Sequence, residues 1–109
     1  MTVRDWILPV FGSPRSIHAI QAAVAEASGL KLDDLLGPSR KPRHAHPRQL
    51  AMFIAKEITG TSYPEIGRAF DRDHTTVMHA CEASRSRIEA DPDFRAAHDE
   101  IVRRIEVRA

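Results

Sequence analysis

The chain has 109 residues, enough for one domain with a modest hydrophobic core and too few for two. With 42% hydrophobic and 28% charged residues, its composition is that of a soluble globular protein and not of a low-complexity chain. A formal net charge of +1 is too small for overall charge to indicate a nucleic-acid partner.

Residues 1–14 are interpreted as an N-terminal segment and residues 15–109 as a single domain. The apolar stretch 6–11 is too short, and too interrupted by proline, for a membrane span or an export signal, so we expect a cytoplasmic protein. Its large apolar side chains either fold back over the core or dock a partner; they are Trp6, Ile7, Val10 and Phe11.

A first helix is expected after Ser13 and Pro14, an N-cap and first-turn pair, and it should end near Gly29. Its buried stripe is formed by Ile17, Ile20 and Val24. A single short helical turn follows and ends at Gly37, before a proline; its apolar residues are Leu32, Leu35 and Leu36.

Residues 37–46 form a basic arm, which prolines and charges predict to be an extended loop. No Asp or Glu occurs between Gly37 and Lys56; the ionisable residues there are Arg40, Lys41, Arg43, His44, His46, Arg48 and Lys56. Such a cluster is favourable beside phosphates because binding releases counterions. The alternative is a solvated linker, which its place directly ahead of the next motif disfavours.

Pro47 is expected to begin a helix that ends at Gly60. Its core residues are Leu50, Phe53, Ile54 and Ile58. Arg48 and Gln49 would then lie in the first turn, beside free backbone amides that attract phosphate.

Residues 62–80 are typical of a helix-turn-helix. Ser62 and Glu65 form a capping box with Pro64 in the first turn, and the buried face carries Ile66 and Phe70. The apolar pattern then breaks, and Asp73 is a suitable N-cap for a second helix.

In this second helix the inner face is expected to consist of Val77, Ala80, Cys81, Ser84 and Ile88. His74 and Thr75 lie on the outer face, where their donors, acceptors and methyl group suit base edges. The alternative is that these residues only cap a helix, which for Asp73 is compatible with DNA contact. Cys81 cannot form an internal disulfide and is read as a core side chain in preference to a reactive thiol.

A last helix is expected after Asp91, packed beneath the second helix of the motif; its apolar face carries Phe94, Ala97, Ile101 and Ile105. Enzyme motifs are missing from the sequence: there is no G-x-x-x-x-G-K loop, no G-x-S-x-G elbow and no H-E-x-x-H pair. We therefore expect a binding protein that is not an enzyme and has neither a cofactor nor a metal.

Three motifs in order resemble the C-terminal DNA-binding domain (domain IV) of the bacterial chromosomal replication initiator DnaA. They are residues 48–56 (RQLAMFIAK), 62–70 (SYPEIGRAF) and 72–80 (RDHTTVMHA). The resemblance extends over roughly residues 16–107. It implies an all-α, compact helical bundle with a helix-turn-helix, similar to the Trp-repressor type. It also implies a monomer on double-stranded DNA, with the helix at His74 in the major groove and a basic loop in the minor groove.

The resemblance also assigns residues to the DNA surface. Base contacts fall on Asp73, His74 and Thr75, with Arg40 in the minor groove. Backbone contacts fall on Arg48, Gln49, Lys56, Thr76 and Pro64, to which we add the neighbouring cations Arg72, Lys41 and Arg43. Two positions depart from the family: its usual two glycines are replaced by Asp71 alone, and His46 stands where arginine is common.

Two functions follow from these patterns. The first is sequence-specific binding to DnaA-box-like sites by a nucleoid-associated bacterial or phage-derived protein, regulating replication initiation or transcription without ATPase activity. The shortened acidic turn should change its affinity or preferred sequence. The alternative is a protein-interaction module that binds a replication initiator or another regulator instead of DNA.

Overall fold

The computed structural model describes residues 16–108 as six α-helices without a strand, which confirms the expected all-α class. The helices are α2 (Ile17–Ala27), α3 (Leu32–Leu36), α4 (Pro42–Thr59), α5 (Tyr63–Phe70), α6 (His74–Ala90) and α7 (Pro92–Arg108). The expectations for Ser13, Pro14 and the apolar stretch 6–11 lie outside the described residues, as does the domain boundary at residue 15. No helix within residues 16–108 is long and apolar enough to cross a bilayer.

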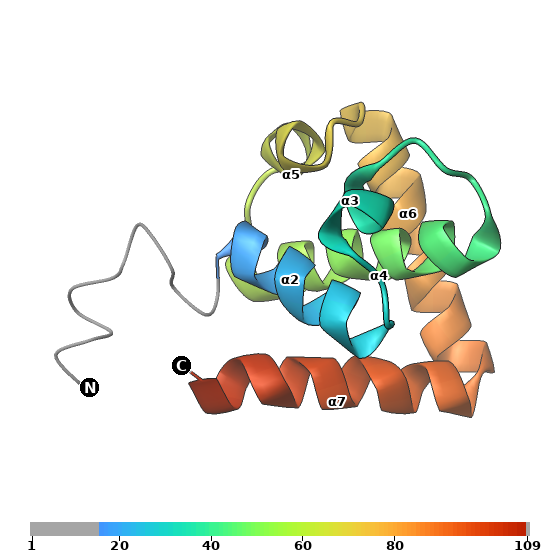
Figure 1. Cartoon of the computed structure of the whole chain (residues 1–109). Coiled ribbons are helices and arrows are strands. Elements are labelled where there is room, and N and C mark those ends of the chain that lie inside the picture. The colour runs from blue at the N-terminus through green and yellow to red at the C-terminus, as the bar shows by residue number, and fades with distance from the viewer. Residues whose placement is uncertain (1–15, 109) are drawn as a thin grey trace, which may run out of the picture.

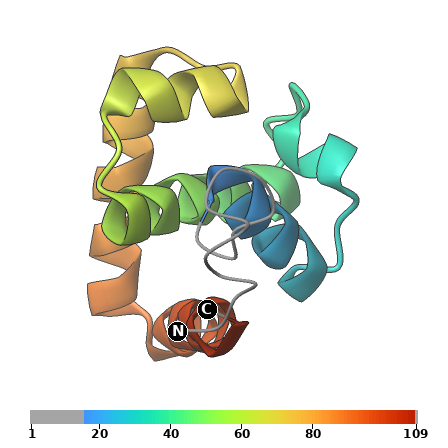
Figure 2. The same cartoon turned by 90° about the vertical axis from the view of Figure 1, so that its left-hand side faces the viewer.

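Helix α4 crosses the middle of the molecule, with α5 and the start of α6 at one end and α7 along the other (Figure 1). The turned view shows α6 running down one side of α4 and α7 beneath it (Figure 2). The side chains that meet at the centre come from all six helices and include Ile20, Leu35, Ile54, Phe70, Val77 and Ile105. Helix α7 contacts α6 as expected, and it also packs on α2 and α4.

Local capping sets the ends of two helices. Ser16 Oγ accepts from the amide of Ala19 at 3.1 Å, and so begins α2. Ser62 Oγ accepts from the amide of Glu65 at 3.3 Å, as the capping box predicts. Asp73 occupies the N-cap of α6, but its side chain makes no cap hydrogen bond. The predicted position was therefore right and the predicted hydrogen bond was not.

The start of α4 differs from the prediction. The helix begins at Pro42, with Lys41 as its N-cap, and Pro47 lies inside it. Either proline suits a first turn, and only packing decides between them. As a result the basic arm is a loop only over residues 37–41, while its remainder is helical. His44 is buried there, with its Nδ1 2.9 Å from Ser39 Oγ.

The turn between α5 and α6 closes around Gly67. The backbone at Asp71 is left-handed, with φ 55° and ψ 49°, and the amide of Arg72 donates to the Gly67 carbonyl at 2.8 Å. A Cβ at Gly67 would collide with the carbonyl oxygen of Arg72. Aspartate tolerates the left-handed region better than most residues, which suits Asp71 to the C-cap that ends α5.

Candidate nucleic-acid interface

The first turn of α6 faces outward. Asp73, His74, Thr75 and Thr76 are all exposed, whereas Val77 is fully buried and begins the inner face. The first backbone hydrogen bond of the helix runs from the amide of Val77 to the carbonyl of Asp73, at 3.2 Å. The amides ahead of Val77 therefore have no carbonyl of this helix to donate to, an arrangement that suits an anionic or base-edge acceptor.

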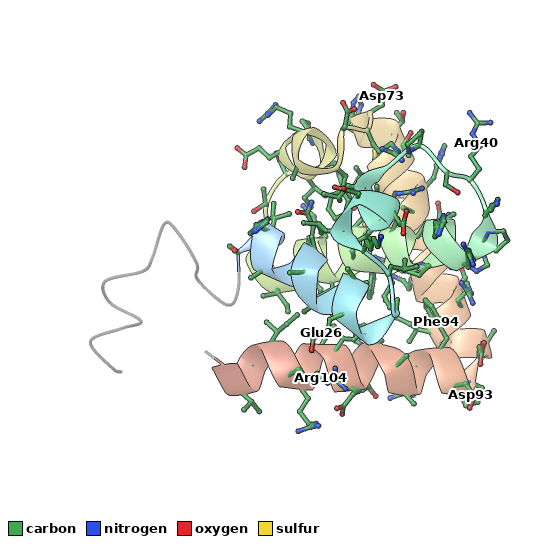
Figure 3. The ribbon with its side chains drawn as sticks, in the orientation of Figure 1. Glu26, Arg40, Asp73, Asp93, Phe94 and Arg104 are labelled. Atoms are coloured by element: carbon green, nitrogen blue, oxygen red, sulfur yellow. The ribbon has the colours of Figure 1, made fainter. Side chains whose placement is uncertain are left out.

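The loop of residues 37–41 brings cationic side chains to the same end of the molecule. Arg40 and Lys41 are exposed, as is Arg43 in the first turn of α4. Figure 3 shows Arg40 pointing away from the fold, at the end that also carries Asp73. Residues far apart in the sequence therefore lie at the same end of the molecule.

Arg72 connects this loop to the helix-turn-helix. Its Nη2 donates to the Gly37 carbonyl at 2.6 Å, and its Nη1 donates to the carbonyls of Phe70 and Asp71 at 2.9 and 3.3 Å. The side chain is half-buried. Three carbonyls thus hold a guanidinium that the sequence assigned to phosphate.

Arg48 is more deeply buried than Arg72, and its predicted position in a first turn is wrong. It lies in the second turn of α4 and is 6% exposed. Its Nε donates to the Leu35 carbonyl at 2.6 Å. Its Nη1 donates to the backbone carbonyl of Ser39 at 2.9 Å, and its Nη2 to the backbone carbonyl of Asp34 at 3.4 Å. Burial and, after it, the charge of Arg72 lower the pKa of the Arg48 guanidinium. The side chain holds α3 and the loop instead of facing solvent.

The other predicted backbone contacts surround this surface. Gln49 is half-buried and Thr76 exposed, and both line a hollow of about 300 Å³ between α4 and α6. Lys56 is half-buried; its Nζ donates to the Thr61 carbonyl at 3.0 Å and lies 4.5 Å from the centre of the Tyr63 ring. Pro64 is exposed in the first turn of α5.

Comparison with known proteins agrees with this geometry. The family described as the bacterial DnaA protein helix-turn-helix matches residues 17–83. The chain belongs to this family of DNA-binding domains. It is 45% identical over 98 residues to the chromosomal replication initiator protein DnaA of Acinetobacter baylyi, and 46% identical to that of Acinetobacter baumannii ATCC 17978. Each match covers 89% of this chain and 21% of the relative, so the chain spans about a fifth of the length of these curated relatives.

Three further residues adjoin the DnaA-type surface and were not assigned to it from the sequence. His79 lines the hollow with Thr76, and helical spacing from Thr76 indicates this position. Met78 is 44% exposed on the outward face of α6. Arg68 borders a second hollow beside Asp73 and ion-pairs with Glu65 at 4.0 Å.

Proposed function

We propose that the chain binds duplex DNA sequence-specifically, at elements similar to DnaA boxes. The observation that carries this proposal is that the exposed first turn of α6 and the loop that bears Arg40 lie at the same end of the molecule. A helix in the major groove and an arginine in the adjacent minor groove read different edges of neighbouring base pairs.

In this proposal Asp73, His74 and Thr75 contact base edges, and Arg40 enters the minor groove. The phosphates are contacted by Gln49, Lys56, Thr76, Lys41 and Arg43, and Pro64 touches the groove wall of the DNA backbone. Arg48 and Arg72 act through the loop, because both guanidinium groups are already bound to backbone carbonyls. The site is asymmetric, so a single copy of the chain is sufficient on each element.

The proposed consequence of binding is regulation of replication initiation or of transcription by occupying such elements. The sequence carries no phosphate-binding loop, so this role depends on occupancy without nucleotide hydrolysis. Under this proposal the protein is found on the nucleoid.

Selection of bound duplexes from a random pool tests the proposal. Enrichment of one asymmetric motif similar to a DnaA box is the expected result. Recovery of unrelated sequences without a motif would reject sequence reading, and recovery of a different strong motif would reject the DnaA-box assignment. The same selection with a His74→Ala variant should lose the positions that the first turn of α6 reads.

A further inference from the structure

A groove of about 470 Å³ lies between the end of α2, the first turns of α4, the last turn of α6 and one face of α7. Figure 3 shows Phe94 and Arg104, which line it, at the opposite end of the molecule from Asp73. The groove is therefore distant from the proposed base-reading turn of α6, and the residue that it shares with the proposed DNA contacts is Arg43.

The floor of this groove is apolar. Leu50 and Ile101 belong to the hydrophobic core and reach its base, and the half-buried Phe94 forms one wall. Ala97 is exposed on the same face of α7 and leaves room above the floor. A space of this size and character fits a bulky apolar side chain with the residues next to it.

Basic side chains surround the floor. Arg43, His46, Arg87 and Arg104 line the groove. The guanidinium of Arg87 lies 4.1 Å from the centre of the Phe94 ring, and its Nη1 is buried without a hydrogen-bond partner among the described residues. A guanidinium forms its strongest hydrogen bonds with a carboxylate, and Arg87 lines the groove.

The carboxylate in the lining, Glu100, pairs with Arg104 but makes no ion pair with Arg43 or Arg87 among the described residues. Glu100 accepts from Arg103 Nη2 at 2.8 Å and from Arg104 Nε at 3.1 Å, so its charge is shared between these two guanidinium groups. These hydrogen bonds lower the pKa of Glu100. Burial and then the charge of Arg87 lower the pKa of His46, so this imidazole is neutral near neutral pH.

We propose that this groove binds an acidic peptide segment of a partner protein. An apolar side chain of the segment packs on Leu50 and Ile101, and a neighbouring carboxylate pairs with Arg87. A nucleic-acid backbone matches the cations but has no apolar side chain for the floor. A ligand that supplies both an apolar side chain and a carboxylate is therefore a peptide. The groove that binds it is a second binding surface of the domain.

The test is fluorescence anisotropy of a short labelled peptide, in which aspartates flank one leucine and one phenylalanine, titrated with the full chain. Two comparison peptides keep only one chemistry each: one replaces the apolar residues with serine, and the other replaces the aspartates with asparagine. Each should bind about tenfold more weakly than the complete peptide, because each loses one of the two contributions. Equal binding by the serine peptide would mean nonspecific charge attraction and would overturn the proposal.

Two substitutions on α7 form a matched pair. Ala97 and Ala96 are both exposed, and only Ala97 lines the groove. Ala97→Glu places a carboxylate against the incoming peptide and should weaken binding about tenfold, while Ala96→Glu should change it less than about twofold. If the two substitutions weakened peptide binding equally, the peptide would not bind in the groove lined by Ala97.

Arg87 has a matched control as well. Arg95 is exposed on α7 outside the groove and pairs with Asp99 at 3.9 Å. Arg87→Gln should weaken peptide binding about tenfold, and Arg95→Gln should leave it within about twofold. Circular dichroism confirms that both variants are folded before they are compared. A folded Arg87→Gln variant with unchanged affinity would overturn the pairing.

His46 supplies an independent readout by nuclear magnetic resonance. A bound carboxylate stabilises the imidazolium, so the resonance of His46 should titrate at higher pH when the peptide is present. An unchanged titration would contradict peptide binding in the groove. A duplex carrying a DnaA-box-like element should not displace the peptide; displacement would show that the groove belongs to the DNA surface and would overturn the proposal while supporting DNA binding.

Discussion

The guanidinium of Arg72 donates to the carbonyl oxygen of Gly37 at 2.6 Å, and this bond joins the turn of the helix-turn-helix to the loop that carries Arg40. The same guanidinium is fixed by carbonyls of its own turn. The distance between the major-groove helix and the minor-groove arginine is therefore set by a side chain that touches neither groove in our proposal.

Arg72→Ala should uncouple the two parts of the surface. Affinity for a DnaA-box-like duplex should fall about tenfold, and a double-mutant cycle of Arg72→Ala with Arg40→Ala should show a coupling of about 1 kcal/mol. Arg68→Ala is the control, since it removes the same charge from an exposed site in α5. Its cycle with Arg40→Ala should be additive. If the effects of Arg72→Ala and Arg40→Ala were also additive, Arg72 would not couple the two parts of the surface.

Arg48→Ala should act on stability. The substitution leaves the buried carbonyl of Leu35 and the partly buried carbonyl of Ser39 without their donor, and should lower the free energy of unfolding by about 2–3 kcal/mol in urea denaturation. Arg40→Ala, at an exposed site, should change it by less than about 0.5 kcal/mol while weakening DNA binding. If both variants unfolded at the wild-type midpoint, Arg48 would not hold the loop.

Asp71→Asn should increase DNA affinity. The carboxylate is exposed beside the proposed phosphate path, and asparagine retains tolerance for the left-handed backbone. Binding to any duplex should tighten about two- to threefold at low salt, and the gain should shrink as salt is added. Asp93→Asn is the control, because Figure 3 shows Asp93 on α7 at the far end of the molecule. Equal gains in DNA affinity from both substitutions would mean that the overall charge of the protein, and not the position of Asp71, determines the effect.

His74→Ala should reduce sequence discrimination with little change in stability, because the side chain is exposed. The affinity ratio between cognate and scrambled duplexes should fall about tenfold, which corresponds to one base contact. Affinity for the scrambled duplex should stay nearly constant. If His74→Ala lowered the affinity for both duplexes equally, His74 would contact phosphates and not base edges.

Sequence patterns predicted the local features of this fold well. Ser62 caps α5 through a hydrogen bond within its own turn, and the inner face of α6 follows from helical period alone. The exposure of His74 and Thr75 follows from the same period. These features depend on residues within a few positions of one another, and so the sequence contains the information that determines them.

Features that depend on distant residues were missed. Pro42 and Pro47 each satisfy the rules for a helix start, and packing of α4 on the rest of the core selected the first. Arg48 belongs to a basic cluster in the sequence, but its partners on α3 and the loop appear only when α3 packs on α4. The groove at α7 combines four helices, and no local pattern indicates it.

The most direct test of sequence reading is the affinity of the unmodified chain for a duplex with a DnaA-box-like element and for a scrambled duplex, measured by fluorescence anisotropy over a range of salt concentrations. Base contacts should favour the first duplex by several kcal/mol, on the order of a hundredfold or more, at every salt concentration, while both affinities fall as salt rises. Equal affinities for the two duplexes throughout the range would contradict the account.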